Sequence, residues 1–140
     1  MKLVWVVAAL IASMATVEAG AAVSAPAPER KQDALLKLYD NRHGRPVYFI
    51  RDTLRKKADY IQIDSLSDHG PDDPSGAKSS TSLMRFKCDK KEVSAVDIVT
   101  FSEKGGRGRM LERLLNPSTS FKPVERGSER EYMLEVACSL

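Results

Sequence analysis

Cysteine, histidine and aromatic residues are scarce in this sequence. Its 140 residues include two cysteines, two histidines and 6% aromatic residues. The motifs GxSxG, HExxH, paired CxxC and GxxxxGK[ST] are all missing. These absences exclude the usual signatures of serine hydrolases, zinc proteases, zinc ribbons and P-loop enzymes. The sequence therefore predicts a non-enzymatic protein that needs no cofactor.

Long apolar stretches are confined to the start of the chain. Leu3–Ala15 is almost continuously apolar, follows one positive charge and precedes small residues, which is the order of a secretory signal peptide. A membrane span needs about 20 apolar residues, and Glu18 interrupts the apolar region before that length is reached. We predict a signal peptide over residues 1–21, cleaved after Ala19 or Ala21, rather than an uncleaved transmembrane anchor.

Export makes the two cysteines informative. Neither lies near the predicted cleavage site, so lipid attachment there is not expected, and we predict a periplasmic or secreted protein. An oxidising compartment favours pairing of an even number of thiols. We expect a Cys88–Cys138 disulfide rather than two free or intermolecular thiols. Closing a loop of about 50 residues contributes roughly 4 kcal/mol in the loop-entropy model.

The mature chain reads as one domain that follows a short arm. Residues 22–28 are Ala, Pro, Ser and Val without periodicity, which predicts a flexible arm. Apolar residues then fall within two helical turns among charged ones, which predicts an amphipathic helix over Glu29–Asp40. Asn41 and Gly44 would end this helix. The single domain is predicted over residues 29–140.

Most of the chain from Pro46 onward is typical of β-strands. Short runs rich in β-branched, aromatic or alternating apolar residues predict extended segments at 46–50, 60–64, 83–88, 93–101, 109–115 and 121–124. Ser67–Ser80 is rich in Pro, Gly, Asp and Ser, which predicts a long loop. Its acidic residues Asp68, Asp72 and Asp73 lack the spacing of a calcium loop, so no metal site is expected.

The C-terminus carries the signal of a final helix. Ser128 and Glu131 form an S-x-x-E capping box, in which the two side chains accept hydrogen bonds from N–H groups at the helix start. The helix would end near Cys138, where the disulfide ties it to the strand before Cys88. The predicted fold class is α+β, a curved antiparallel sheet with an N-terminal amphipathic helix and a C-terminal helix held by the disulfide.

Basic residues concentrate around the hairpins of the second half. The chain has 22 Lys and Arg against 19 Asp and Glu, a net charge of +3. Seven of these cations lie in adjacent hairpins and are candidates for one partner-binding patch: Lys87, Lys90, Lys91, Lys104, Arg107, Arg109 and Arg113. The alternative is that they are solvated strand and edge charges. The glycine-rich segment from Gly105 to Arg109 also allows two interpretations, a plain hairpin turn or an anion-binding nest.

Several segments together resemble a known family. Tyr60–Leu66, Phe86–Asp89 and Phe121–Ser128, followed by the half-cystine Cys138, are similar to the ordered motifs of the surface-adhesin protein E family of small exported bacterial domains. The resemblance covers about Val47 to Cys138. It implies a curved antiparallel sheet with a disulfide-held C-terminal helix. It also implies an adhesin-like protein, since the name-giving members are surface lipoproteins that bind host matrix and plasma proteins.

Two functions are expected on these grounds. The first is an exported binding protein whose partner is a protein or an acidic glycan; nucleic acid is not expected, because export separates the chain from it and aromatic residues are sparse. The second is a periplasmic inhibitor or immunity protein that blocks an enzyme with a hairpin such as Glu103–Arg109. The sequence predicts no oligomeric state.

Overall fold

The described part of the protein is one antiparallel sheet with a single helix packed against it. A computed structural model describes residues 34–115 and 120–140. The described elements are β1 (Leu35–Asp40), β2 (Pro46–Lys56), β3 (Ile61–Asp68), β4 (Ser79–Lys87), β5 (Glu92–Glu103), β6 (Arg107–Leu115), β7 (Lys122–Pro123) and α1 (Glu129–Ser139).

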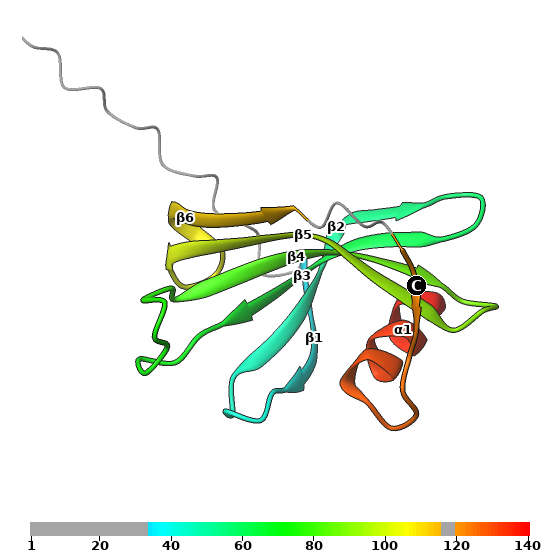
Figure 1. Ribbon diagram of the computed structural model, residues 1–140, viewed down its shortest axis with the longest axis horizontal. Coiled ribbons are helices and arrows are strands. Elements are labelled where there is room, and N and C mark those ends of the chain that lie inside the picture. Colours follow the sequence, from blue (N-terminus) through cyan, green and yellow to red (C-terminus); the bar gives the residue numbers. More distant parts are fainter. Residues whose placement is uncertain (1–33, 116–119) are drawn as a thin grey trace, which may run out of the picture.

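The strands follow one another across the sheet in chain order. β1 to β6 form a simple antiparallel meander, because each connection is a hairpin or a loop between neighbours. β7 pairs with the first residues of β5, beside Glu92 and Val93. Among the described strands, β1 therefore forms one edge, and β6 followed by the short β7 forms the other. Figure 1 shows β6 lying far from α1.

The core lies between α1 and one face of the sheet. In β4 the side chains alternate as predicted, with Met84 and Phe86 buried. Phe86 meets the ring of Phe49 edge to face, with 5.9 Å between the ring centroids. Met133 and Leu134 on α1 belong to the same buried cluster. The helix thus covers the part of the sheet where β4 ends and β5 begins.

The predicted disulfide and helix cap are both present. Cys88 and Cys138 are bonded, with 5.9 Å between their Cα atoms, and link the end of β4 to the last turn of α1. The Ser128 hydroxyl accepts a hydrogen bond from the N–H of Glu131 at 3.2 Å. The Glu131 carboxylate in turn accepts a hydrogen bond from the N–H of Gly127. A capping box would use the N–H of the next residue, Ser128.

The N-terminal helix prediction is wrong where the structure tests it. Leu35–Asp40 form the edge strand β1 and not the second half of a helix. The apolar run is short enough to fit either period, and pairing with β2 decides for the strand. The pairing of β1 with β2 shifts register between Lys37 and Tyr39. At this bulge the Leu38 side chain points into the core, where it is 8% exposed.

Other predictions concern residues that the structure leaves undescribed. The signal peptide over 1–21, its cleavage at Ala19 or Ala21, the arm over 22–28 and the first residues of the predicted helix all lie outside the described residues. They stay predictions. The loop predicted over Ser67–Ser80 is shorter than expected, because β3 extends to Asp68 and β4 begins at Ser79.

Candidate functional site

The seven candidate cations do not form one patch. Successive turns of an antiparallel meander lie at opposite ends of the sheet, and β5 separates the two hairpins concerned. Its 12 residues span roughly 35 Å at about 3.3 Å per residue. Lys87, Lys90 and Lys91 therefore lie at the disulfide end of the sheet, which consists of α1 and residues 84–93. Lys104 and Arg107 lie at the other end. The expectation of one shared edge is wrong for this geometric reason.

The group near the disulfide is partly used in packing. The Lys87 ammonium lies 4.3 Å from the centre of the Phe121 ring and 3.9 Å from a carboxylate oxygen of Asp59. Lys90 and Lys91 form the exposed turn that follows Cys88, where Lys91 has a φ of 51°. Only two cations of this group are thus available to a partner.

The second group is on the last hairpin and its strand. Arg113 forms a bidentate ion pair with Asp97, 2.7 Å at its shortest, and this partner raises the pKa of the guanidinium. Lys104, Arg107 and Arg109 are exposed. We call residues 104–115, the hairpin turn together with β6, the β6 lip.

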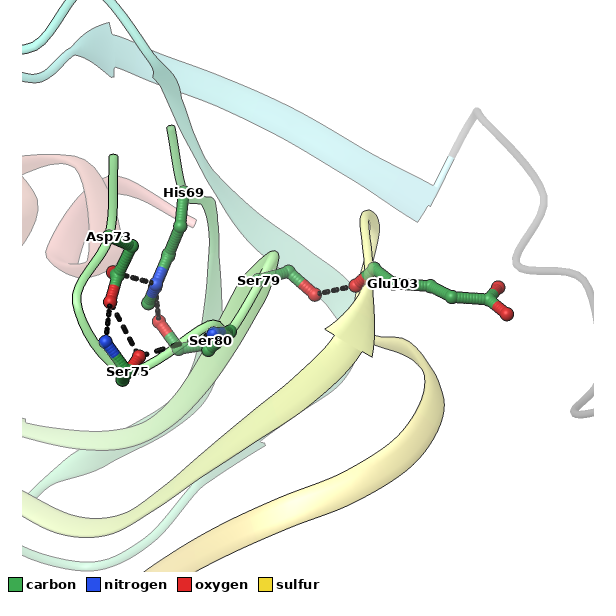
Figure 2. A network of polar contacts seen from close by, with 7 residues as sticks. His69, Asp73, Ser75, Ser79, Ser80 and Glu103 are labelled. Atoms are coloured by element: carbon green, nitrogen blue, oxygen red, sulfur yellow. Dashed lines mark hydrogen bonds and ion pairs between the residues drawn. The ribbon is translucent and has the colours of Figure 1, made fainter. Parts of the chain in front are cut away.

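The glycine-rich turn is not an anion nest. The N–H of Gly105 donates to Asp68 at 2.8 Å, and the N–H of Gly106 donates to the Ser79 hydroxyl at 2.9 Å. The Ser79 hydroxyl donates to the backbone carbonyl of Glu103, a contact drawn in Figure 2. These amides hold the hairpin against the neighbouring strands and are not free for a phosphate or sulfate.

The β6 lip carries exposed apolar side chains that sequence reasoning missed. Every residue of β6 is exposed, including Met110 (55%), Leu111 (40%), Leu114 (54%) and Leu115 (62%). The signal was a missing alternation: these residues come in two adjacent pairs, whereas a strand with one buried face alternates apolar and polar residues. Exposed aliphatic residues on a basic sheet edge make β6 the candidate contact surface for another macromolecule.

A second cluster lies in the loop between β3 and β4. Figure 2 shows His69 between Asp73 and Ser80. Nε2 of His69 lies 2.9 Å from the Ser80 hydroxyl oxygen. The buried Nδ1 lies 2.6 Å from a carboxylate oxygen of Asp73, without the alignment of a hydrogen bond. The Ser75 hydroxyl and N–H both donate hydrogen bonds to the Asp73 carboxylate. These two bonds, and to a smaller extent His69, hold the pKa of the Asp73 carboxyl below its usual range.

Ser80, His69 and Asp73 are arranged like the Ser-His-Asp triad of a hydrolase. The other groups that such a catalytic site needs are not found around them. Acyl transfer also needs N–H donors aimed at the developing oxyanion. Ser80 lies in an inner strand and pairs with Ser67 and Thr100 on its two sides, so the ladders engage the backbone there. A cavity of about 360 Å³ touches His69 and Asp73, and Ser80 does not line it. The cluster ties the loop to β4.

The acidic loop residues form no metal centre. Among residues 34–115 and 120–140, no group of three or more His, Cys, Asp or Glu side chains is placed to hold a metal ion. Asp68 accepts a hydrogen bond from the Gly105 amide, and Asp73 interacts with Ser75 and His69.

Within residues 34–115 and 120–140, no helix is both long and apolar enough to cross a membrane.

The fold and its lip define a class of protein: a small domain with one sheet, closed at one end by a disulfide-bonded helix and open at the other. The family model described as surface-adhesin protein E matches residues 35–139. The chain belongs to this family. Family membership and the disulfide indicate an extracytoplasmic protein, and the family is that of an adhesin, a class that is typically non-enzymatic.

Solved structures of protein E from Haemophilus influenzae have the same fold. Its selenomethionine form and its crystal form II are each 12% identical in sequence to this chain and superpose on it with TM-scores of 0.57 and 0.58. The match covers 83% of this chain and 93% and 94% of those chains. At this identity the similarity shows the fold alone. A comparison with curated proteins finds no match.

Proposed function

We propose that this chain is an exported, non-enzymatic binding protein of the surface-adhesin protein E type and that it holds its partner on the β6 lip. The observation that carries the proposal is that every residue of β6 is exposed, including its aliphatic side chains and Arg107 and Arg109. Aliphatic side chains gain from excluding water and offer nothing to sugar hydroxyls. They favour a protein partner over an acidic glycan.

The test compares two charge reversals that are equal in size. Arg107→Glu with Arg109→Glu alters the β6 lip, whereas Lys90→Glu with Lys91→Glu alters the turn at the other end of β5. Retention of the purified mature protein on immobilised matrix and plasma proteins is measured by surface plasmon resonance. We expect the first variant to bind at least about tenfold more weakly and the second to bind like the wild type. Equal behaviour of the two variants would contradict the proposal.

Export is the second part of the proposal. Cleavage after Ala19 or Ala21 would release a chain that starts shortly before the described domain, in the periplasm or outside the cell. The disulfide and the family support this compartment. Mass spectrometry of the protein isolated from cells tests it: an N-terminus at residue 20 or 22 is expected, and one at Met1 contradicts it.

A periplasmic enzyme inhibitor is the second candidate, favoured by the anchored hairpin. The turn of the β5–β6 hairpin is held by Asp68 and Ser79, so it presents Lys104 in a fixed position. Inhibitory hairpins gain affinity from such preorganisation. Inhibition of wall-degrading activity in a periplasmic extract, lost in the Lys104→Glu variant, would support this function over adhesion.

A further inference from the structure

The two edges of the sheet differ in what they offer to another chain. A sheet edge presents unpaired N–H and C=O groups along its outer side, and most proteins cover or blunt it. β1 is short, bulged and packed by Leu36, Leu38 and Tyr39 against the core. β6 has nine residues and no proline, and no described strand lies on its outer side. Among the described strands, β6 is thus the edge that is open to pairing.

The part of β6 best suited to pairing is its second half. Its register with β5 is continuous over Glu112–Leu115, opposite Thr100 to Asp97. Register shifts interrupt the strand before this stretch, around Leu111 and toward the hairpin. Leu114 and Leu115 point to opposite faces here and are both more than half exposed. An added strand would cover an apolar side chain on each face.

A second copy of this chain is a poor occupant of this edge. β6 carries three arginines and one glutamate, a net charge of 3 − 1 = +2, which a second β6 would repeat. Two-fold pairing centred on any residue from 107 to 113 also sets like charges opposite each other, which destabilises a ladder. Pairing centred on Leu114 avoids this, but within the described part of the strand it joins only residues 113–115. Around Leu111, Arg109 would lie opposite Arg113. Around Met110, Arg107 would lie opposite Arg113. If the two-fold axis passed through Arg109, Glu112 or Arg113, that residue would lie opposite its own copy.

The charges favour a segment of opposite sign. Arg113 is already neutralised by Asp97, so the free cations lie at the hairpin end, on Arg107 and Arg109. The apolar residues extend to the other end of β6. The complementary segment is therefore extended, acidic at one end and aliphatic at the other.

On the basis of the proposed function, we infer that β6 binds an acidic, aliphatic segment of the partner protein as an additional β-strand. The main chain of that segment pairs with the outer edge of Glu112–Leu115. Its aliphatic side chains cover Leu114 and Leu115, and its carboxylates lie beside Arg107 and Arg109.

Synthetic peptides test this mode directly on the mature protein. The parent probe is a blocked, fluorescently labelled peptide of about ten residues, with alternating valine and threonine in one half and glutamates in the other. A second peptide has the same side chains but N-methyl groups on alternate amides, which removes donors from one edge. A third carries lysine in place of glutamate. Binding is measured by fluorescence anisotropy up to about 1 mM, the weak end of measurable affinities.

We expect the parent peptide to bind and both altered peptides to bind at least about tenfold more weakly. The Arg107→Glu, Arg109→Glu variant should reverse the preference between glutamate and lysine peptides, and the Lys90→Glu, Lys91→Glu variant should not. Equal binding of the N-methylated peptide, no binding of the parent peptide, or a dimer of the free protein in sedimentation equilibrium that the peptide dissociates would each overturn the inference. If any of these occurs while the retention assay still depends on Arg107 and Arg109, the proposed function stands and only strand addition fails.

Discussion

The disulfide end and the β6 lip are built from the same sheet in opposite ways. At the disulfide end, aromatic and aliphatic side chains are buried and a covalent bond fixes the helix. On the β6 lip every residue of the strand is exposed. Stability and exposure therefore lie in different parts of the sheet, because β6 pairs only with residues 97–103 of β5, and a partner can bind the lip without disturbing the core.

The largest test of this separation is removal of the disulfide. Cys88→Ser with Cys138→Ser should lower the free energy of unfolding by about 4 kcal/mol, because a loop closed over a separation of 50 residues constrains the unfolded chain. Urea denaturation measures it. Amide exchange should accelerate in α1 and much less in β6. An unchanged urea midpoint would show that the disulfide end does not depend on its bond.

Two identical truncations compare the regions next. Leu134 is 4% exposed and Leu114 is 54% exposed. Leu134→Ala should cost about 3 kcal/mol through lost burial and a cavity, whereas Leu114→Ala should cost about 0.5 kcal/mol or less. Thermal unfolding of both variants under one set of conditions gives the difference. Similar losses would mean that β6 contributes to the core.

The backbone of the lip is tested at Gly108. Its φ is +79°, and a Cβ there would lie 2.5 Å from the Ser102 hydroxyl, which accepts the N–H of Arg109. Gly108→Ala should therefore cost about 2 kcal/mol, from the left-handed backbone and the lost bond together. Gly76→Ala is the matched control, with a φ of +70° and no atom within 4 Å. It should cost about 1 kcal/mol, and an equal cost at both positions would contradict the close approach.

The last effect appears only at high pH and concerns the covered edge, β1. Burial, and then the Glu129 carboxylate, raise the pKa of Tyr39 from 10.0 to about 12. The folded protein holds this proton more tightly than the unfolded chain, so the contribution of Tyr39 to stability is constant below pH 10 and is lost as the pH rises to 12. Tyr39→Phe should remove this loss in melts between pH 9 and pH 12, and Tyr132→Phe should keep it. If the Tyr39→Phe variant melts like the wild type over this whole pH range, Tyr39 of β1 is not buried against α1.

Local signals in the sequence predicted the disulfide end correctly. The capping box at Ser128 and Glu131, the alternation around Phe86 and the pairing of two cysteines each depend on few residues. The strand at Leu35–Asp40 could not be separated from a helix, since its partner β2 decides its conformation. The scattered cations could have been divided by topology alone, because successive hairpins alternate between the ends of a meander. The approach of His69 to Ser80 depends on how the loop folds back, which no local pattern encodes.

The most direct test of the account is hydrogen exchange, followed by mass spectrometry, of the protein alone and with the acidic, aliphatic peptide. We predict slower exchange over Arg107–Leu115 and no change over the loop of residues 69–78 or the turn of residues 88–91. Slower exchange in either of those segments, with β6 unchanged, would contradict the assignment of recognition to the β6 lip.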